Sequence, residues 1–306
     1  MSSNLVNKIL IWSLLEEIVE TISDNYAYPA MDKAAQEYSL SPDYYTWASA
    51  VWLFSSGEFT IRQFMRVFPY GLAQVNEERF MAAIRQGFLT SDGQDRYHPT
   101  ESGLNVATRI FRAANEGIAP IHPMPEESLN RLGYLLAHIS DAAFEAPEPP
   151  VNFILSRKRD LYRRMGMVES LEGLCTHCLE MEGHRDDAYI TSWQAHQVEG
   201  HAWEMLDLLS SSEALAFDDL HEKLSRRGVT EDVHAEDVRE LTGRGWVEVV
   251  LGKIQITAVG KQVRAEVEAE TERQFFAPWS CLSETELDEL AILAGQLRDG
   301  LKTEGV

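Results

Sequence analysis

The sequence predicts a mainly α-helical chain with tandem winged helix-turn-helix domains, each made of three helices and a β-hairpin wing, and a helical middle segment. Two observations predict this fold class. The same order of apolar helices, a glycine, a short hairpin and a Thr-x-x-Gly motif occurs twice along the chain. Six of the eleven prolines fall between residues 120 and 150, and because proline interrupts helices, this stretch separates the two occurrences.

The two occurrences have nearly equal internal spacing. Gly87 precedes Thr100 by 13 residues, and Gly245 precedes Thr257 by 12. Each glycine follows a helix at a position that favours positive φ, and each threonine is placed to cap the next helix. Three segments with helical apolar periodicity come before each glycine. Their apolar residues are Trp47, Val51, Trp52, Phe54, Ile61, Phe64, Met65, Phe68, Phe80 and Ile84 in the first copy, and Trp203, Leu206, Leu209, Phe217, Leu220, Leu224, Val238 and Leu241 in the second.

A β-hairpin is predicted between each glycine and threonine, because an aromatic-aliphatic pair, a polar turn and a second apolar run lie there. With this hairpin, both copies resemble the MarR-like winged-helix family over about residues 45–116 and 200–275. The segments Gly183–Trp193 and Phe275–Trp279 are also similar to the SalK-like helix-turn-helix family. These resemblances imply a winged-helix fold and a regulator-like protein.

The predicted organisation has six parts. They are an N-terminal helical segment (1–44), a first winged helix (45–116), a proline-bounded linker with a helix (117–150), a helical middle segment (151–199), a second winged helix (200–279) and a C-terminal helix (280–306). The terminal helices Leu5–Ile22 and Leu287–Leu301 each carry an apolar stripe, and Ser283 with Glu286 forms a capping box before the second. These stripes predict a homodimer interface; packing within one chain is the alternative.

Charge and composition limit the class of protein. The chain has 27 Lys and Arg against 49 Asp and Glu, a net charge of −22, which opposes general binding to nucleic acid. Its 44% hydrophobic and 9% aromatic residues are ordinary globular values and exclude a disordered chain. No apolar run reaches the roughly 18 residues of a membrane span, and no signal peptide is evident. We therefore expect a cytoplasmic protein without a membrane segment.

The two copies differ in their ability to contact DNA. Residues 231–240, in the predicted third helix of the second copy, contain five acids and one arginine, which would repel phosphates. The first copy is neutral overall, with seven basic and seven acidic residues. Its candidate DNA-binding residues are Gln74, Asn76, Arg79 and Arg96.

A basic cluster at residues 156–164 is a further candidate for phosphate contacts. Its candidate residues are Arg157, Lys158 and Arg159, and Arg163 and Arg164 complete the cluster. In an acidic chain, such a cluster more often pairs with the protein's own carboxylates. The DNA interpretation and the self-pairing interpretation both stay open here.

Aromatic residues raise the hypothesis of a small-molecule pocket. Tyr45, Trp47, Trp193, Trp203 and Trp279 are candidates for lining a small-molecule pocket, although aromatic residues more often form the core.

The segment 175–201 contains residue types that bind zinc. It has one C-x-x-C, formed by Cys175 and Cys178, with His184 nearby, but no second ligand pair at suitable spacing. We therefore expect no metal and no cofactor. Since no catalytic motif is present either, a metal-dependent enzyme is the least favoured interpretation.

The favoured function is that of a transcriptional-regulator-like protein of the MarR-like winged-helix class. It would bind duplex DNA through the first copy and respond to a small-molecule ligand. The alternative is an acidic winged-helix scaffold that serves protein contacts or binds a small molecule without binding DNA.

Overall fold

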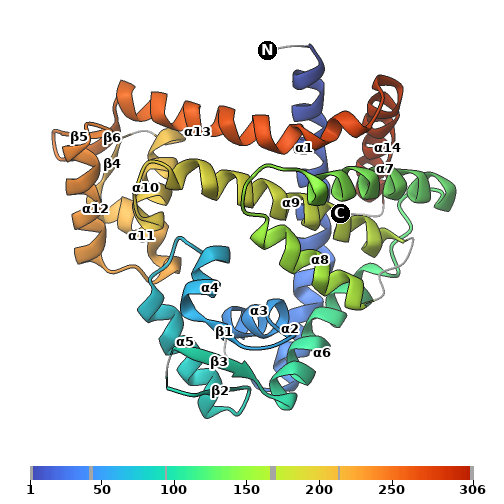
Figure 1. Cartoon of the computed structure of the whole chain (residues 1–306), viewed down its shortest axis with the longest axis horizontal. Helices are drawn as coiled ribbons and strands as arrows, with labels where there is room; N and C mark the ends of the chain where they lie inside the picture. Colours follow the sequence, from blue (N-terminus) through green and yellow to red (C-terminus); the bar gives the residue numbers. More distant parts are fainter. Residues whose placement is uncertain (1–2, 41–43, 94, 166–169, 213, 304–306) are drawn as a thin grey trace. The chain divides into compact units, whose positions relative to one another are not determined.

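The protein is mainly α-helical with small antiparallel sheets, so the predicted fold class is confirmed (Figure 1). The computed structural model describes residues 3–40, 44–93, 95–165, 170–212 and 214–303. The chain divides into two compact units. One unit consists of Met1–Gly57, Pro99–Asp187 and Gln274–Val306, and the other of Glu58–His98 and Ala188–Arg273.

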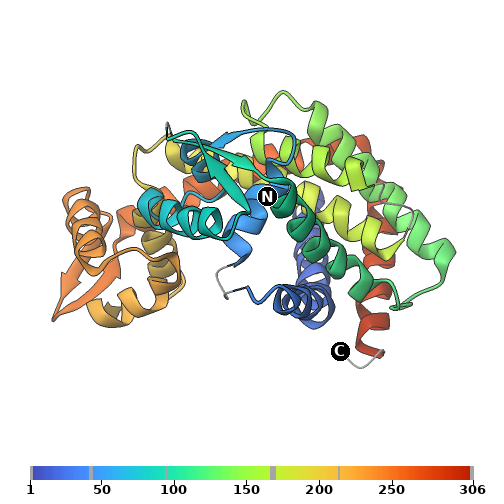
Figure 2. The same cartoon turned by 90° about the horizontal axis from the view of Figure 1, so that it is seen from below.

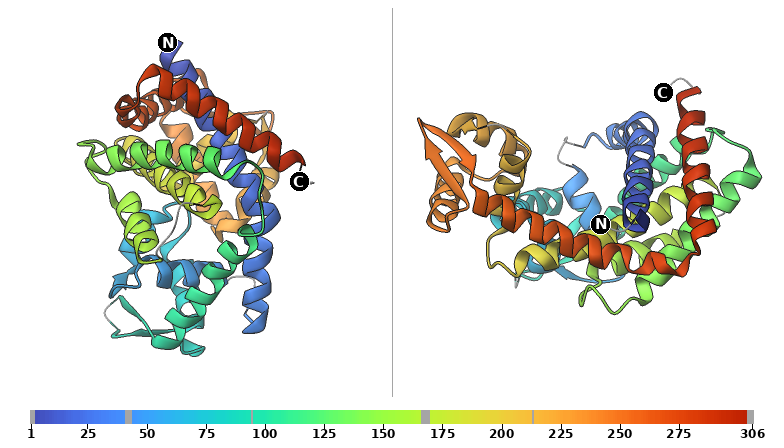
Figure 3. Two further views of the ribbon diagram at one scale, coloured as in Figure 1. Left: turned by 90° about the vertical axis from the view of Figure 1, so that its right-hand side faces the viewer. Right: turned by 90° about the horizontal axis from the view of Figure 1, so that it is seen from above.

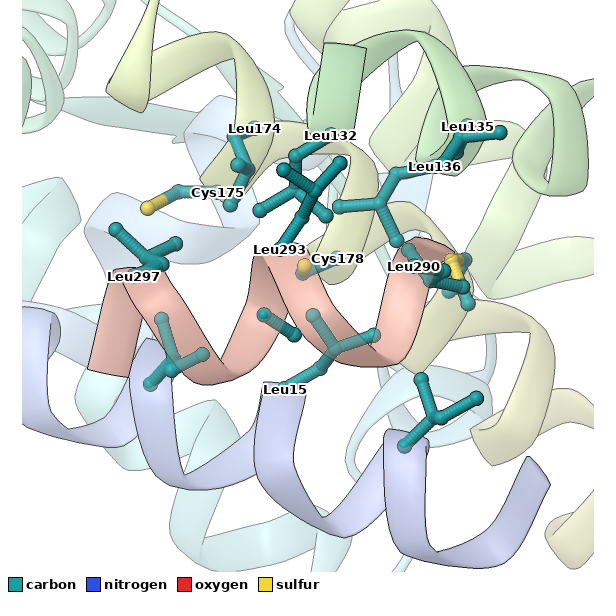
Figure 4. Close-up of a cluster of buried hydrophobic side chains, with 14 of the residues drawn as sticks. Leu15, Leu132, Leu135, Leu136, Leu174, Cys175, Cys178, Leu290, Leu293 and Leu297 are labelled. Atoms are coloured by element: carbon teal, nitrogen blue, oxygen red, sulfur yellow. The ribbon is translucent and has the colours of Figure 1, made fainter. Parts of the chain in front are cut away.

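The first unit is a bundle of helices. Its elements are α1 (Ser3–Ile22), the π-helical turn η1 (Ser23–Ala27), α2 (Tyr28–Glu37), α3 (Tyr44–Leu53), α6 (Glu101–Ile118), α7 (Glu126–Glu145), α8 (Phe153–Met165), most of α9 (Leu171–Gln194), the 3₁₀ turn η3 (Pro278–Cys281) and α14 (Glu284–Thr303). The breaks on either side of α7 coincide with the proline-rich stretches. Figure 4 shows leucines from α1, α7, α9 and α14 that point toward one another in the core of this unit.

The two terminal helices pack against each other inside one chain (Figure 3). Leu15 and Ile18 of α1 and Leu290 and Leu297 of α14 are completely buried. The predicted capping box before α14 is confirmed, since the backbone N–H of Ser283 donates to Glu286 Oε2 at 2.9 Å. The apolar stripes are thus covered within the chain, and the homodimer stays a prediction.

The second unit contains most elements of the two predicted helix-turn-helix copies. From the first copy come β1 (Phe59–Thr60), α4 (Ile61–Val67), α5 (Ala73–Arg85), β2 (Leu89–Ser91) and β3 (Arg96–Pro99). From the second copy come α10 (Gly200–Ser210), β4 (Leu215–Ala216), α11 (Phe217–Leu224), η2 (Ser225–Arg227), α12 (Glu231–Gly243), β5 (Val247–Val250), β6 (Lys253–Ile256) and α13 (Ala258–Phe276), whose last turn belongs to the first unit.

The predicted copies have the same order of elements. The first runs α3, β1, α4, α5, β2, β3, α6, and the second runs α10, β4, α11, α12, β5, β6, α13. Their sheets have equivalent strand orders, β1-β3-β2 and β4-β6-β5, and the β5–β6 hairpin is visible in Figure 2. The sequence did not predict β1 and β4, because a strand of two residues carries no periodicity.

Local signals at the helix ends act as predicted. Gly87 and Gly245 have φ of 78° and 72°, the left-handed conformation that closes a helix. The side chain of Thr100 caps α6 by accepting a hydrogen bond from the N–H of Gly103 at 3.0 Å. In the second copy, Thr257 accepts from the N–H of Gly260 at the same distance of 3.0 Å.

Candidate nucleic-acid interface

The predicted first helix-turn-helix begins with a well-capped helix. Thr60 and Gln63 form a reciprocal capping box at the start of α4, which fixes where this helix begins. After the turn, α5 exposes a row of side chains at helical spacing, namely Gln74, Glu78, Met81 and Arg85. Because a DNA-reading helix needs exposed hydrogen-bond donors, Gln74 and Arg85 are available for such contacts, whereas Glu78 opposes them.

Asn76 has a different position from the one that DNA binding requires. It is only 5% exposed, and its Nδ2 donates to the carbonyl of Leu72 at 3.2 Å. Its Oδ1 accepts from Nη1 of Arg79 at 3.4 Å. Asn76 therefore holds the start of α5 and orients Arg79.

Arg96 lies at the start of β3 in the first wing. Its Nη1 donates to Glu58 Oε1 at 2.8 Å, and both side chains are about half exposed. An exposed ion pair of this kind contributes only about 0.2–1 kcal/mol. Since the pair is weak, the guanidinium can exchange Glu58 for a phosphate.

The turn of the first helix-turn-helix packs against the second copy within the same unit. The guanidinium of Arg227 lies 5.3 Å from the centre of the Tyr70 ring, and that ring is 6.3 Å from Trp193. A Cβ atom added to Gly228 would meet Val75 at 2.7 Å, so this glycine lets α5 approach closely. The inner side of the start of α5 is therefore occupied, while Gln74 remains exposed.

The basic residues of α8 lie in the first unit and have partners there. The guanidinium of Arg157 lies over the rings of Phe54 and Phe153, at 5.2 and 5.5 Å. Nζ of Lys158 donates to Glu182 at 2.8 Å. Arg159 is 7% exposed; it donates to the carbonyl of Ser140 and pairs with Asp141. These contacts favour the self-pairing interpretation, and the side chains of Arg163 and Arg164 lie outside the described residues.

The aromatic candidates for a ligand pocket are mostly core residues. Trp47 and Trp279 are 4% and 0% exposed in the first unit. In the second unit, Trp193 and Trp203 are 2% and 0% exposed, and their rings stack at 6.1 Å. Tyr45, in contrast, is 44% exposed. The five residues are thus divided between the two units, and a pocket that they line together stays a prediction.

The acidic residues of α12, the third helix of the second copy, lie in two environments, one exposed and one buried. Glu231, Asp232 and Glu236 of α12 are exposed. Asp237 is 3% exposed, and both of its carboxylate oxygens lie 2.9 Å from Nδ1 of His201. The exposed side of α12 is therefore negative and unsuited to phosphates.

Three histidines gather at the centre of this second helix-turn-helix. Nδ1 of His221 in α11 lies 2.8 Å from Nδ1 of His234 in α12, next to the His201–Asp237 pair. Burial lowers the pKa of His234 below its ordinary value, which the charge of Asp237 partly opposes. Burial alone would also lower the pKa of His201, but its hydrogen bond to Asp237 raises it. Motif spacing in the sequence does not reveal this group, because its members are separated along the chain.

Three candidates of the Cys/His segment, Cys175, Cys178 and His184, lie on α9. Cys175 and Cys178 are buried in the core of the first unit, where burial raises the pKa of Cys175 to about 12 and that of Cys178 well above its usual value. His184 is 1% exposed, and burial lowers its pKa to about 4. Among the described residues, no group of three or more His, Cys, Asp or Glu side chains is arranged to hold a metal ion. Thiols with raised pKa behave as small apolar side chains.

We predict that the purified protein contains no stoichiometric zinc. Zinc binding requires thiolates, and both thiols of α9 lie in an apolar core that disfavours the charged form. Elemental analysis of protein prepared without chelator measures this directly. One zinc per chain in the native protein, lost in Cys175→Ala, would contradict the prediction.

Comparison with known proteins gives one match. A family model described as a helix-turn-helix family matches residues 177–306, which contain most of α9, the second copy and α14. No curated protein and no solved structure matches the chain. The match supports a helix-turn-helix fold for this part of the chain. No helix among the described residues has the length and apolar character needed to cross a membrane.

Proposed function

We propose that the protein is a DNA-binding regulator of the MarR-like winged-helix class in which the two copies have different roles. The first copy, with predicted limits 45–116, contacts duplex DNA. The second, with predicted limits 200–279, serves regulation and protein contacts. The family match at residues 177–306 supports a helix-turn-helix fold for the second copy, and the first copy has the same order of elements. This kind of fold commonly places a recognition helix in the major groove.

The observation that carries this proposal is the contrast between α5 and α12. Exposed side chains on α5 include Gln74 and Arg85, and the partly exposed Arg79 donates to Asn76. The corresponding surface of α12 exposes Glu231, Asp232 and Glu236. Phosphates repel the second set and accept hydrogen bonds from the first.

The structure also changes which residues we assign to the DNA surface. Gln74, Arg79 and Arg96 are retained, the exposed Arg85 is added, and Asn76 is assigned to positioning Arg79. We assign only an auxiliary role in phosphate contacts to the basic residues of α8, because each has a partner within its own unit. They are Arg157, Lys158 and Arg159.

Gel-shift experiments with the full-length protein and fragments of its own genome test this function. The affinity should fall with salt along a shallow slope, since each phosphate contact contributes about −0.9 to the slope of log affinity against log salt. A few contacts therefore imply weak non-specific binding. Absence of any complex at low salt would remove the regulator function.

An acidic scaffold is the second candidate function. The exposed acids of α12 favour it, because a negative helix surface suits a basic partner protein better than DNA. Loss of all DNA binding together with capture of a basic partner would support this alternative.

We further predict a homodimer. The apolar stripes of α1 and α14 are buried within the chain. We therefore expect the dimer interface to use the apolar side chains that these two helices leave exposed. They are Val6 at 43%, Leu10 at 64% and Ile292 at 62%. Light scattering at micromolar concentration should return about twice the chain mass of 34.6 kDa. A value near 34.6 kDa would contradict the prediction, and Leu10→Lys should shift a true dimer toward monomer.

A further inference from the structure

The contact between His221 and His234 joins the two helices of the second helix-turn-helix. His221 lies on α11 and His234 on α12, and their Nδ1 atoms are 2.8 Å apart. His234 is 1% exposed, and His221 is partly exposed, so protons reach the pair from the His221 side. This connection is a direct side-chain hydrogen bond between α11 and α12.

The chemistry of imidazole restricts the protonation of this pair. A hydrogen bond between two Nδ1 atoms needs one nitrogen that carries a proton and one that offers its lone pair. Two neutral imidazoles satisfy this condition, and so does a pair that holds one extra proton. When both rings are imidazolium, all four nitrogens are donors, and the contact loses its acceptor and gains charge repulsion.

The distance between the Nδ1 atoms of the two rings is that of a hydrogen bond. Zinc binds imidazole nitrogen at about 2.0–2.1 Å in tetrahedral geometry, which separates two ligand nitrogens by roughly 3.3 Å. The observed 2.8 Å is shorter and is typical of a hydrogen bond.

Charged groups from the neighbouring elements surround the pair. On α10, His201 is paired with Asp237 of α12, and Glu204 is paired with Arg227 of η2 at 2.7 Å. Asp237 and Glu204 favour protonation of His234, whereas His201 and His221 oppose it. Glu199 and Glu240 act on His201 and favour its charged form. The negative charge of Asp237 is already engaged by His201, so it compensates a second proton on the pair only in part.

We propose that the His221–His234 contact is a proton-sensitive latch, which is closed while at least one imidazole is neutral and opens when both are protonated, so that acid releases α11 from α12. The latch lies in the copy that carries the acidic α12 and does not depend on DNA binding by the first copy.

The two coupled histidine sites respond to pH in opposite directions. The folded-state pKa of His234 is lowered, so the stability that it contributes is present above its ordinary pKa of 6.5 and is lost as the pH falls toward the folded value. The folded-state pKa of His201 is raised, so its contribution is present below 6.5 and is lost as the pH rises through the folded value. Acid therefore weakens the latch while the His201–Asp237 pair still holds α10 to α12.

Nuclear magnetic resonance of the full-length protein with ¹⁵N-labelled histidine, in buffer with EDTA, tests the latch. At pH 7 we expect scalar coupling between the two Nδ1 atoms across the hydrogen bond, and loss of this coupling as the pH is lowered to 5. Hydrogen exchange, corrected for the intrinsic rate at each pH, should show loss of protection in α11 over the same range. No coupling at pH 7, or equal protection of α11 at pH 7 and 5, would overturn the proposal.

Variants separate the latch from general acid sensitivity. His234→Asn introduces the residue that the first copy has at the same place, four residues into its third helix, where Asn76 is also buried. We expect this variant to lose the pH dependence of α11 protection. His221→Asn should do the same and serves if His234→Asn does not fold. His98→Asn, a change in the first wing, should keep the pH dependence of the native protein; pH dependence that persists in both latch variants contradicts the proposal.

Discussion

Reversal of the charge at Arg79 and Arg96 to glutamate should abolish binding of duplex DNA. Arg79 lies in the middle of α5 and donates to Asn76, and Arg96 is the cation at the start of the β3 strand of the first wing. Two lost phosphate contacts would reduce the salt slope by about 1.8, at about 0.9 for each contact, and the two new carboxylates would add repulsion. Gel shifts and fluorescence anisotropy over a series of salt concentrations measure both effects.

Matched substitutions on the second copy serve as the control. Replacement of Glu231 and Glu236 by glutamine removes two exposed charges from α12 and should change DNA binding little. Asp237 is unsuitable for this control, because its carboxylate is buried against His201. If the double arginine variant bound DNA like the native protein while the α12 variant did not, the roles of the two copies would be reversed.

Gly260→Ala should destabilise the protein by about 1–3 kcal/mol. Gly260 lies in the first turn of α13, where a Cβ atom would come within 2.2 Å of the carbonyl oxygen of Trp246 and 2.8 Å of Ile256. That carbonyl also accepts the backbone N–H of Thr257 at 2.9 Å, so it cannot move without loss of this bond. The helix itself must therefore shift away from the wing.

Gly243→Ala provides the control for this substitution. Gly243 is the last residue of α12 in the same copy, and a Cβ atom added there meets nothing within 4 Å. Because alanine favours helix over glycine, we expect this variant to be unchanged or more stable by up to about 1 kcal/mol. Urea unfolding followed by tryptophan fluorescence measures both variants, and equal stabilities would show that α13 tolerates the added atom.

Much of the fold could be predicted because its signals are local. Apolar periodicity gave the helices, Gly87 and Gly245 gave the helix ends with positive φ, and the Thr-x-x-Gly motif gave the starts of α6 and α13. Each of these signals acts within a few residues of chain, where backbone geometry and hydrogen bonding are set by sequence neighbours. The charge contrast between the two third helices could be read in the same way.

The candidate site was less predictable, because its residues depend on contacts between distant segments. Asn76 has a side-chain amide of the kind that contacts bases, yet this side chain is buried against Leu72 and Met65. Arg159 belongs to a basic run, yet it binds the carbonyl of Ser140 from another helix. Sequence alone gives the donor or the charge of a side chain but not the partner that folding brings to it.

The sequence by itself thus determined the helical class, the two similar orders of elements, the helix ends and the acidic character of α12. Only the tertiary structure decided that the terminal helices bury their apolar stripes against each other, that the elements of the first copy divide between two units, and that His201, His221, His234 and Asp237 meet. The physical reason is the distance along the chain over which each kind of interaction acts. Periodicity and capping are satisfied within one helix, whereas burial and side-chain pairing are settled by whichever distant surfaces come into contact when the chain folds.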